Sequence, residues 1–119
     1  MQQSGLHLML ITNRKGTRWV IPKGIVEPEL TALQSAEKEA FEEAGIEGRS
    51  FDESLGEFSY EKWGGLCVVE VFPLEVKSLA EDWPEACFRE REWVTPEEAV
   101  RRVREPELKN IIRKFANRY

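Results

Sequence analysis

The stretch GIVEPELTALQSAEKEAFEEAGI (Gly24–Ile46) carries the pattern that decides the fold. Three of its acidic residues, Glu39, Glu42 and Glu43, follow the i, i+3, i+4 spacing, which places their carboxylates on one face of a helix. Repulsion destabilises such a face by a few tenths of a kcal/mol per close pair unless cations occupy it. Mg²⁺ suits this arrangement because it prefers oxygen ligands and is usually held by few carboxylates together with water and substrate phosphates.

The same glutamates also fit the solvated face of an ordinary surface helix, in which Lys38 pairs with Glu42. Thr31 is a plausible N-cap and Gly45 a C-cap glycine, so the stretch predicts a helix over residues 31–44. A stripe along this helix is expected to face the core, and it consists of Leu33, Glu37, Ala40 and Ala44, flanked by Ala36 and Phe41. The helix alone leaves the metal-binding and the solvated interpretations open.

The spacing of the whole stretch resembles the Nudix box, G-x5-E-x7-R-E-U-x-E-E-x-G-U, in which U is aliphatic. The positions that fit it are Gly24, Glu39, Ala40, Glu42, Glu43, Gly45 and Ile46. Leu30 occupies the first glutamate position, and Lys38 replaces the arginine. The helix carboxylates are intact, so the resemblance favours metal binding, whereas the two departures leave full activity less certain.

Membership of the Nudix family implies an α/β (α+β) fold, the Nudix α/β/α sandwich with a mixed sheet, formed here by a single domain over residues 1–119. It also implies hydrolysis of a phosphoanhydride by water with Mg²⁺, or alternatively Mn²⁺, as cofactor. By this resemblance Glu39 and Glu43 ligate the metal and the carbonyl of Gly24 adds a ligand. Glu42 accepts the proton of the attacking water.

Two further segments are similar to the diphosphoinositol polyphosphate phosphohydrolase branch of the family. They are LITNRKGTRWVIPKG and LAEDWPEACFREREWVTPEEAV, the second of which lies outside the general Nudix box. This likeness implies substrates such as inositol pyrophosphates or diadenosine polyphosphates. Hydrolysis of nucleoside triphosphates, or a non-catalytic Nudix domain that senses a phosphorylated ligand, remain as alternatives.

Basic residues in both segments are candidates for binding the polyphosphate, because guanidinium and ammonium groups are its natural partners. These candidates are Arg14, Lys15, Arg18, Lys23, Arg89 and Arg91. The simpler interpretation of the same residues is a solvated loop and a polar strand face. Trp63, beside two glycines in a turn, is the tryptophan best placed to contact a ligand, whereas Trp19 and Trp93 are expected to be structural anchors.

Alternation and turn residues predict five strands, over 6–12, 18–21, 55–62, 66–76 and 88–94, with the fourth central in the sheet and Phe88 and Trp93 anchoring the last. Two further helices are predicted over 95–103, with a Thr cap and proline in the first turn, and over 106–119. The strands and helices interleave, which favours a layered α/β or α+β sandwich.

Composition limits the classes of function. The net charge of −5 argues against general binding to a nucleic-acid polymer, although a local basic cluster can still bind a small anionic substrate. The sequence contains no run long enough for a membrane span and no signal peptide, so a cytoplasmic location is expected. Cys67 and Cys87 form no zinc-binding pair, and His7 is the only histidine, which leaves little for a Ser–His–Asp mechanism.

The N-terminus suggests a departure from the usual Nudix sheet. Nudix domains usually begin with a strand before the one at 6–12, and MQQSG is too short for a strand and a turn. An absent first strand leaves unpaired N–H and C=O groups on its neighbour, which favours association edge to edge. A homodimer, a start further upstream, or a loop that covers the edge are the three outcomes considered.

Overall fold

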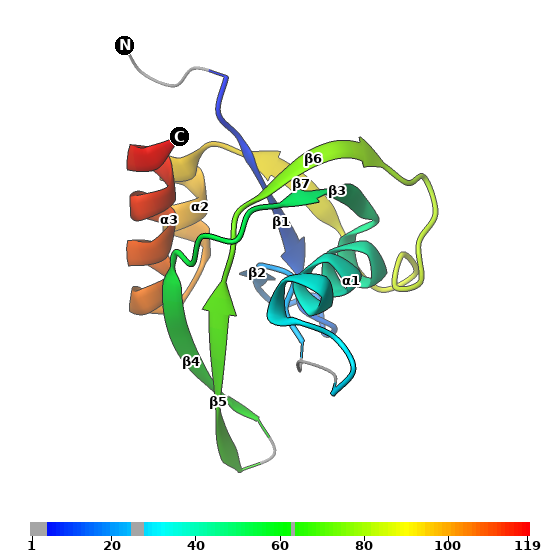
Figure 1. Cartoon of the computed structure of the whole chain (residues 1–119), viewed down its shortest axis with the longest axis horizontal. Helices are drawn as coiled ribbons and strands as arrows, with labels where there is room; N and C mark the ends of the chain where they lie inside the picture. The colour runs from blue at the N-terminus through cyan, green and yellow to red at the C-terminus, as the bar shows by residue number, and fades with distance from the viewer. Residues whose placement is uncertain (1–4, 25–27, 63) are drawn as a thin grey trace.

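The computed structural model describes residues 5–24, 28–62 and 64–119 (Figure 1). In chain order the elements are β1 (Leu8–Thr12), β2 (Trp19–Val20), α1 (Ala32–Ala44), β3 (Ile46–Ser50), β4 (Gly56–Lys62), β5 (Gly65–Val71), β6 (Leu74–Leu79), β7 (Arg91–Val94), α2 (Pro96–Arg102) and α3 (Pro106–Arg118). The strands lie between α1 on one side and the pair α2 and α3 on the other (Figure 1). The predicted α/β sandwich is therefore confirmed.

Strand β1 supplies side chains to both cores of the sandwich because successive residues of a strand point to opposite faces. Leu10 belongs to the cluster beneath α2 and α3, whereas Met9 and Ile11 belong to the cluster beneath α1. Beneath α2 and α3 the buried residues are Leu10, Leu55, Phe58, Val94, Ala99, Val103, Leu108, Ile111 and Ile112. Beneath α1 they are Met9, Ile11, Val20, Ala40, Ala44 and Ile46.

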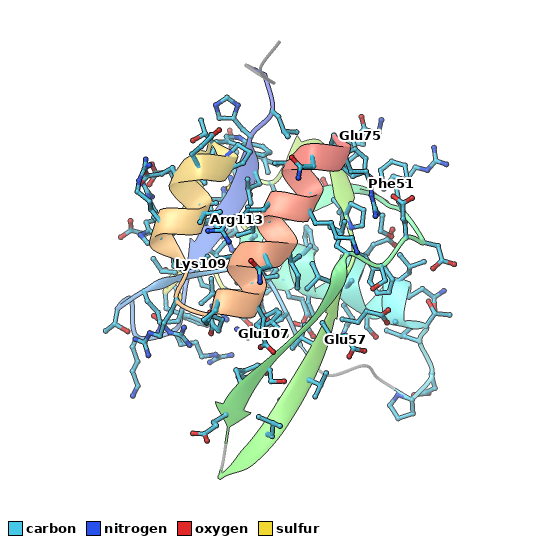
Figure 2. All side chains as sticks on the ribbon, turned by 90° about the vertical axis from the view of Figure 1, so that its left-hand side faces the viewer. Phe51, Glu57, Glu75, Glu107, Lys109 and Arg113 are labelled. Atoms are coloured by element: carbon cyan, nitrogen blue, oxygen red, sulfur yellow. The ribbon has the colours of Figure 1, made fainter. Side chains whose placement is uncertain are left out.

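Helix α3 is held to α2 and to β4 by side chains that Figure 2 labels. Lys109 Nζ donates to the carbonyls of Val100 and Val103, and the second of these hydrogen bonds is 2.7 Å long. Glu107 Oε1 accepts a 3.1 Å hydrogen bond from the main-chain N–H of Ser59 on β4. These contacts hold the helical layer against the strands.

The described strands form three small antiparallel sheets, β2-β1-β7, β3-β6 and β4-β5, where one mixed sheet is expected from the family resemblance. Two bends account for part of the division. The chain bends between β3 and β4, and it bends again at Phe72-Pro73 between β5 and β6. Two main-chain hydrogen bonds still join the two bends, from Leu55 N to Val71 O and from Phe51 N to Pro73 O. The β4-β5 pair then extends away from the body of the molecule (Figure 1).

Two strand predictions need correction, and one strand is missing from the prediction. The strand predicted over 66–76 is broken by Pro73, which cannot donate a ladder hydrogen bond, and it is not central, since Leu66 and Val68 are 70% and 59% exposed. The strand predicted over 88–94 is limited to 91–94, because Phe88 N donates to Glu85 O in a turn and Glu90 N donates to the Thr12 hydroxyl oxygen instead of a strand carbonyl. Strand β3, with the sequence IEGRS, was not predicted because it is mostly exposed and lacks alternation.

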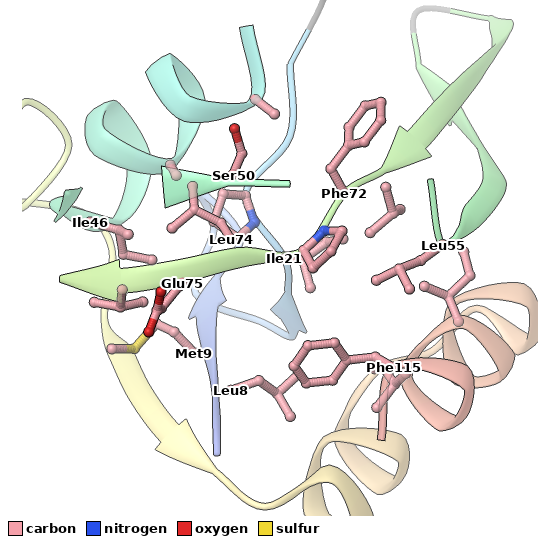
Figure 3. Close-up of a pocket in the computed structure, with 18 of the residues that line it drawn as sticks. Leu8, Met9, Ile21, Ile46, Ser50, Leu55, Phe72, Leu74, Glu75 and Phe115 are labelled. Carbon is pink, nitrogen blue, oxygen red and sulfur yellow. The ribbon is translucent and has the colours of Figure 1, made fainter. Parts of the chain in front are cut away.

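A cavity of about 540 Å³ separates β1 from the β5-β6 segment (Figure 3). Its lining includes runs of consecutive residues, 6–9 from the β1 segment and 69–76 from β5 and β6. Within β1, β5 and β6 the lining residues 8–9, 69–71 and 74–76 are consecutive, and because consecutive side chains of a strand point to opposite faces, they indicate that strand edges border the cavity. Within the described part of the chain, β1 pairs with β2 only at Ile11 and Thr12, and no strand precedes β1.

Among the described residues, no helix is long and apolar enough to cross a membrane. Trp19 is half-buried and packs on the core as expected of an anchor. Trp93 is 43% exposed and Phe88 37% exposed, so neither has the buried position that an anchor requires. Cys67 and Cys87 are free thiols.

Candidate active site

Helix α1 carries the glutamates and is capped at both ends. Thr31 and Gln34 form a capping box, in which the Thr31 side chain accepts from Gln34 N and the Gln34 side chain accepts from Thr31 N. Gly45 ends the helix in the left-handed conformation, with φ 67°, and its N–H donates to the carbonyls of Ala40 and Phe41. The caps confirm the predicted helix and fix the position of its last turn, where Glu42 and Glu43 lie.

Glu43 is directed into the protein. It is 7% exposed, and its Oε1 accepts a 3.2 Å hydrogen bond from the main-chain N–H of Lys23 and lies 3.7 Å from Arg89 Nη2. Burial, followed by a hydrogen bond with the Glu39 side chain, raises the pKa of Glu43 to about 8, against the opposing effects of the Lys23 N–H and Arg89. Glu39 and Glu43 therefore behave as a close pair of acidic groups.

Gly24 lies directly against Glu39. A Cβ placed on Gly24 would be 2.2 Å from the carboxyl carbon of Glu39 and 2.3 Å from its Oε2, so any side chain here would displace the carboxylate. The sequence predicts that Gly24, Glu39 and Glu43 act together, and the structure brings these three residues together. A glycine at position 24 lets the main chain approach the Glu39 carboxylate without displacing it.

Glu42 is held apart from this group. Its side chain is 35% exposed, and Oε2 forms a 3.4 Å ion pair with Lys38, the residue that replaces the arginine of the box. The three glutamates of this helical face thus divide into a contacting pair, Glu39 and Glu43, and Glu42, whose carboxylate pairs with Lys38. Leu30, the other departure from the box, is half-buried just before α1.

The donor set fits a hard divalent cation. Two carboxylates in contact repel each other when both are ionised, and a dication relieves that repulsion. Glu39 and Glu43, together with main-chain oxygen near Gly24, offer the oxygen ligands that Mg²⁺ and Mn²⁺ accept. Within the described residues, no group of three acidic, His or Cys side chains is arranged to hold a metal ion.

Lys23 and Arg89 are the predicted basic residues that adjoin the carboxylates. Arg89 is almost buried and is held on three sides, by Glu85 Oε1 at 2.8 Å, the Thr12 carbonyl at 2.8 Å and Glu43 at 3.7 Å. Lys23 places its ammonium 4.9 Å from the centre of the Tyr60 ring. Burial lowers the pKa of Lys23, while Glu43 raises it.

The other predicted basic residues lie further from the carboxylate pair. Arg18 pairs with Glu105 at 3.0 Å. Lys15 is exposed in the turn after β1, and exposed Arg14 contacts Glu85 and the ring of Phe88. Arg91 donates to the carbonyls of Ala44 and Ala80, at 2.7 and 2.6 Å, and its guanidinium stacks on Trp83, so its donors are directed at the end of α1.

Two residues at this site are not among those predicted from the sequence. Tyr60 contacts Lys23, and its place two residues after Phe58 on an alternating strand is the signal that could have found it. Glu105 occupies the N-cap position of α3 without a side-chain capping hydrogen bond, and its Oε1 is buried without a hydrogen-bond partner in the described part of the structure. Trp63, the predicted ligand contact, lies outside the described residues.

The structure is an α/β sandwich in which Glu39 on α1 lies against Gly24, and comparison with known proteins identifies its family. The family model described as NUDIX domain matches residues 1–116. The chain belongs to the Nudix family.

Named relatives support this assignment. The chain is 33% identical over 113 residues to Nudix hydrolase 21, chloroplastic, from Arabidopsis thaliana, covering 93% of this chain and 57% of that protein. It is 34% identical over 96 residues to diphosphoinositol polyphosphate phosphohydrolase 3-alpha from Mus musculus, covering 79% of this chain and 57% of that protein. The chain thus spans a little over half the length of these relatives.

A solved structure shares the fold. The crystal structure of the C. elegans Ap4A hydrolase matches with a TM-score of 0.72 and 22% identity, over 93% of this chain and 84% of that one. At this identity the likeness concerns the arrangement of helices and strands. It agrees with the sandwich described above.

Proposed function

We propose that this protein hydrolyses phosphoanhydride bonds in polyphosphorylated small molecules, of the diphosphoinositol polyphosphate or diadenosine polyphosphate type. The observation that carries the proposal is the contact of Glu39 with both Gly24 and Glu43, beside the cations of Lys23 and Arg89. The named relatives, which include a diphosphoinositol polyphosphate phosphohydrolase, support this substrate class.

In the proposed mechanism Glu39, Glu43 and the main chain of Gly24 would hold Mg²⁺ or Mn²⁺, which would supply neutralising charge at phosphate oxygens and a lower pKa for water. Glu42, the accessible carboxylate, accepts a proton from the attacking water. The water oxygen forms a bond to phosphorus, and the bond from phosphorus to the bridging oxygen breaks. The leaving phosphate takes the electron pair of that bond.

The cations Lys23 and Arg89 are proposed to hold the substrate in line. Arg89 is already fixed by Glu85 and the Thr12 carbonyl, so its charge is positioned before substrate arrives. Arg14, Lys15 and Arg18 are proposed to bind outer phosphates, since they lie on the turn and strand that lead to Lys23. Arg91 lies on β7, and its guanidinium, bonded to the Ala44 carbonyl at the end of α1, is proposed to contribute positive charge to the substrate site.

A panel of substrates tests the proposal. Purified protein with Mg²⁺ or Mn²⁺ would be assayed against diphosphoinositol polyphosphates, diadenosine polyphosphates and nucleoside triphosphates, with EDTA as control. We expect turnover of the first or second class. Preference for nucleoside triphosphates would favour a triphosphate pyrophosphohydrolase instead.

A non-catalytic sensor is the second candidate function, and the Lys38–Glu42 ion pair favours it. In this pair Lys38 engages the carboxylate of Glu42, which is the proposed base. Binding of a polyphosphate without turnover in any metal would support the sensor and contradict the hydrolase.

We also propose that the cavity between β1 and the β5-β6 segment accepts an extended segment of a second copy, giving a homodimer. The strand edges that border this cavity, at residues 6–9 and 69–76, support the proposal. Light scattering over a dilution series should show dissociation of a dimer. A monomer at every concentration would contradict it.

The cellular location proposed is the cytoplasm. Some relatives carry the words chloroplastic or mitochondrial in their names, so location varies within this group. Fractionation of the source cells with antibody detection would test the proposal, and recovery in an organelle fraction would contradict it.

A further inference from the structure

The ring of Tyr60 lies between the apolar core and the charged site. Tyr60 is half-buried on β4 and packs against the cluster beneath α2 and α3, with its ring centre 6.4 Å from that of Phe58. The Lys23 ammonium lies 4.9 Å from the centre of the same ring. This distance is within the range of a cation–π contact.

The main chain of Lys23 is fixed to the carboxylate site, whereas its ammonium lies at the Tyr60 ring. Its main-chain N–H donates to Glu43 Oε1, so the backbone of Lys23 and the proposed metal ligand move together. The side chain is long and would otherwise sample many rotamers, which would have to be ordered when an anion binds. The Tyr60 ring restrains it before binding, and the attraction strengthens where water is excluded.

We propose that Tyr60 is a positioning residue, whose ring face holds the Lys23 ammonium beside the carboxylate pair in readiness for a substrate phosphate. The inference rests on the proposed function of the site and adds a residue that the Nudix box does not contain. The positioning of Lys23 is assigned to the ring face of Tyr60, because the ring is the part of Tyr60 that contacts the ammonium. The hydroxyl, which lies near Cys67 across the β4-β5 pair, is not required.

Conservative and disruptive variants of Tyr60 separate the ring from the hydroxyl. Tyr60→Phe keeps the ring face, so we expect KM and kcat within about twofold of wild type, whereas Tyr60→Leu removes it and should raise KM about fivefold with a smaller change in kcat. Phe115→Leu is the matched control, because Phe115 packs against the same cluster from α3. It should lower the melting temperature without changing KM.

A double-mutant cycle shows whether Tyr60 acts through Lys23. In a Lys23→Met background, Tyr60→Leu should add little further loss, since the cation is already absent. Full additivity of the two losses would overturn the proposal. Equal damage from Tyr60→Phe and Tyr60→Leu would overturn it as well, by assigning the effect to the hydroxyl.

Two measurements keep this inference separate from the hydrolase proposal. The ring should shift the NMR signals of the Lys23 εCH₂ upfield in wild type and Tyr60→Phe but not in Tyr60→Leu, whatever the activity. Calorimetric titration of inorganic tripolyphosphate with Mg²⁺ into Glu42→Gln protein should give a dissociation constant about fivefold weaker when Tyr60→Leu is added. An unchanged constant, or no ring shift, would overturn the role of Tyr60 even if turnover is found.

Discussion

Gly24 and Glu39 are packed so closely that a Cβ on Gly24 would be 2.2 Å from the Glu39 carboxyl carbon. A contact this short requires one of the two residues to move. The main chain before α1 and the carboxylate on α1 thus lie in contact, and a side chain at position 24 would have to move the end of the Glu39 side chain.

Substitution of Gly24 by alanine should therefore displace Glu39 and weaken metal binding. We expect Mn²⁺ affinity and turnover to fall at least about tenfold, since ligand position governs both. Calorimetric titration with Mn²⁺ measures the effect. Gly5→Ala is the control, because nothing lies within 4 Å of a Cβ there. Equal affinity in the Gly24 variant would show that Glu39 is not a ligand.

Replacement of Glu42 by glutamine should abolish turnover and leave the fold intact. Loss of a general base costs about 10²–10⁴-fold in rate. The partner ion pair with Lys38 is exposed and contributes less than about 1 kcal/mol, so the melting temperature should change little or rise as repulsion on the helix decreases. Near wild-type turnover on every substrate of the panel would refute the role of Glu42.

Restoring the two consensus residues tests whether the box is weakened. Leu30 is half-buried and belongs to neither core cluster, so Leu30→Glu should be tolerated. We expect Leu30→Glu with Lys38→Arg to raise kcat/KM above either single change. A clear drop in melting temperature in both the single and the double variant would show that Leu30→Glu buries a charge. It would rule out the interpretation that the consensus glutamate and arginine were lost together as a functional pair.

The raised pKa of Glu43 predicts how stability depends on pH. Its folded value of about 8 lies above the ordinary 4.5, so between these values the folded chain holds the extra proton. This contribution is fully present below pH 4.5 and is lost as pH rises through about 8. In EDTA the melting temperature should fall from about pH 5 to about pH 8, and Glu43→Gln should flatten that fall. An unchanged slope in Glu43→Gln would contradict the assignment.

Local signals made α1 predictable. Thr31 and Gly45 mark its ends with side-chain and backbone chemistry that acts within one turn, and both caps are confirmed. The same holds for α2, where Thr95 accepts from Glu98 N and Pro96 begins the helix. Capping depends on neighbours in sequence, so the sequence contains enough information to locate it.

Features that depend on tertiary contacts were harder to predict. The spacing of Glu39, Glu42 and Glu43 shows a common face, but the difference in burial between Glu42 and Glu43 depends on Lys23 and Arg89, which are distant in sequence. Within the described part of the chain, strand β3 pairs with β6 alone, and its exposed residues give no alternating pattern. Such elements are defined by their partners.

The central claim is that Glu39 and Glu43 support hydrolysis that depends on a divalent cation. The most direct measurement follows phosphate release from a diphosphoinositol polyphosphate and a diadenosine polyphosphate by ³¹P NMR, with Mg²⁺ or EDTA. Wild type and the exposed control Glu57→Gln should turn over one of them with Mg²⁺ only, and Glu39→Gln and Glu43→Gln should lose at least about 10²-fold in rate. Turnover that persists in EDTA, or in both variants at the wild-type rate, would contradict the account.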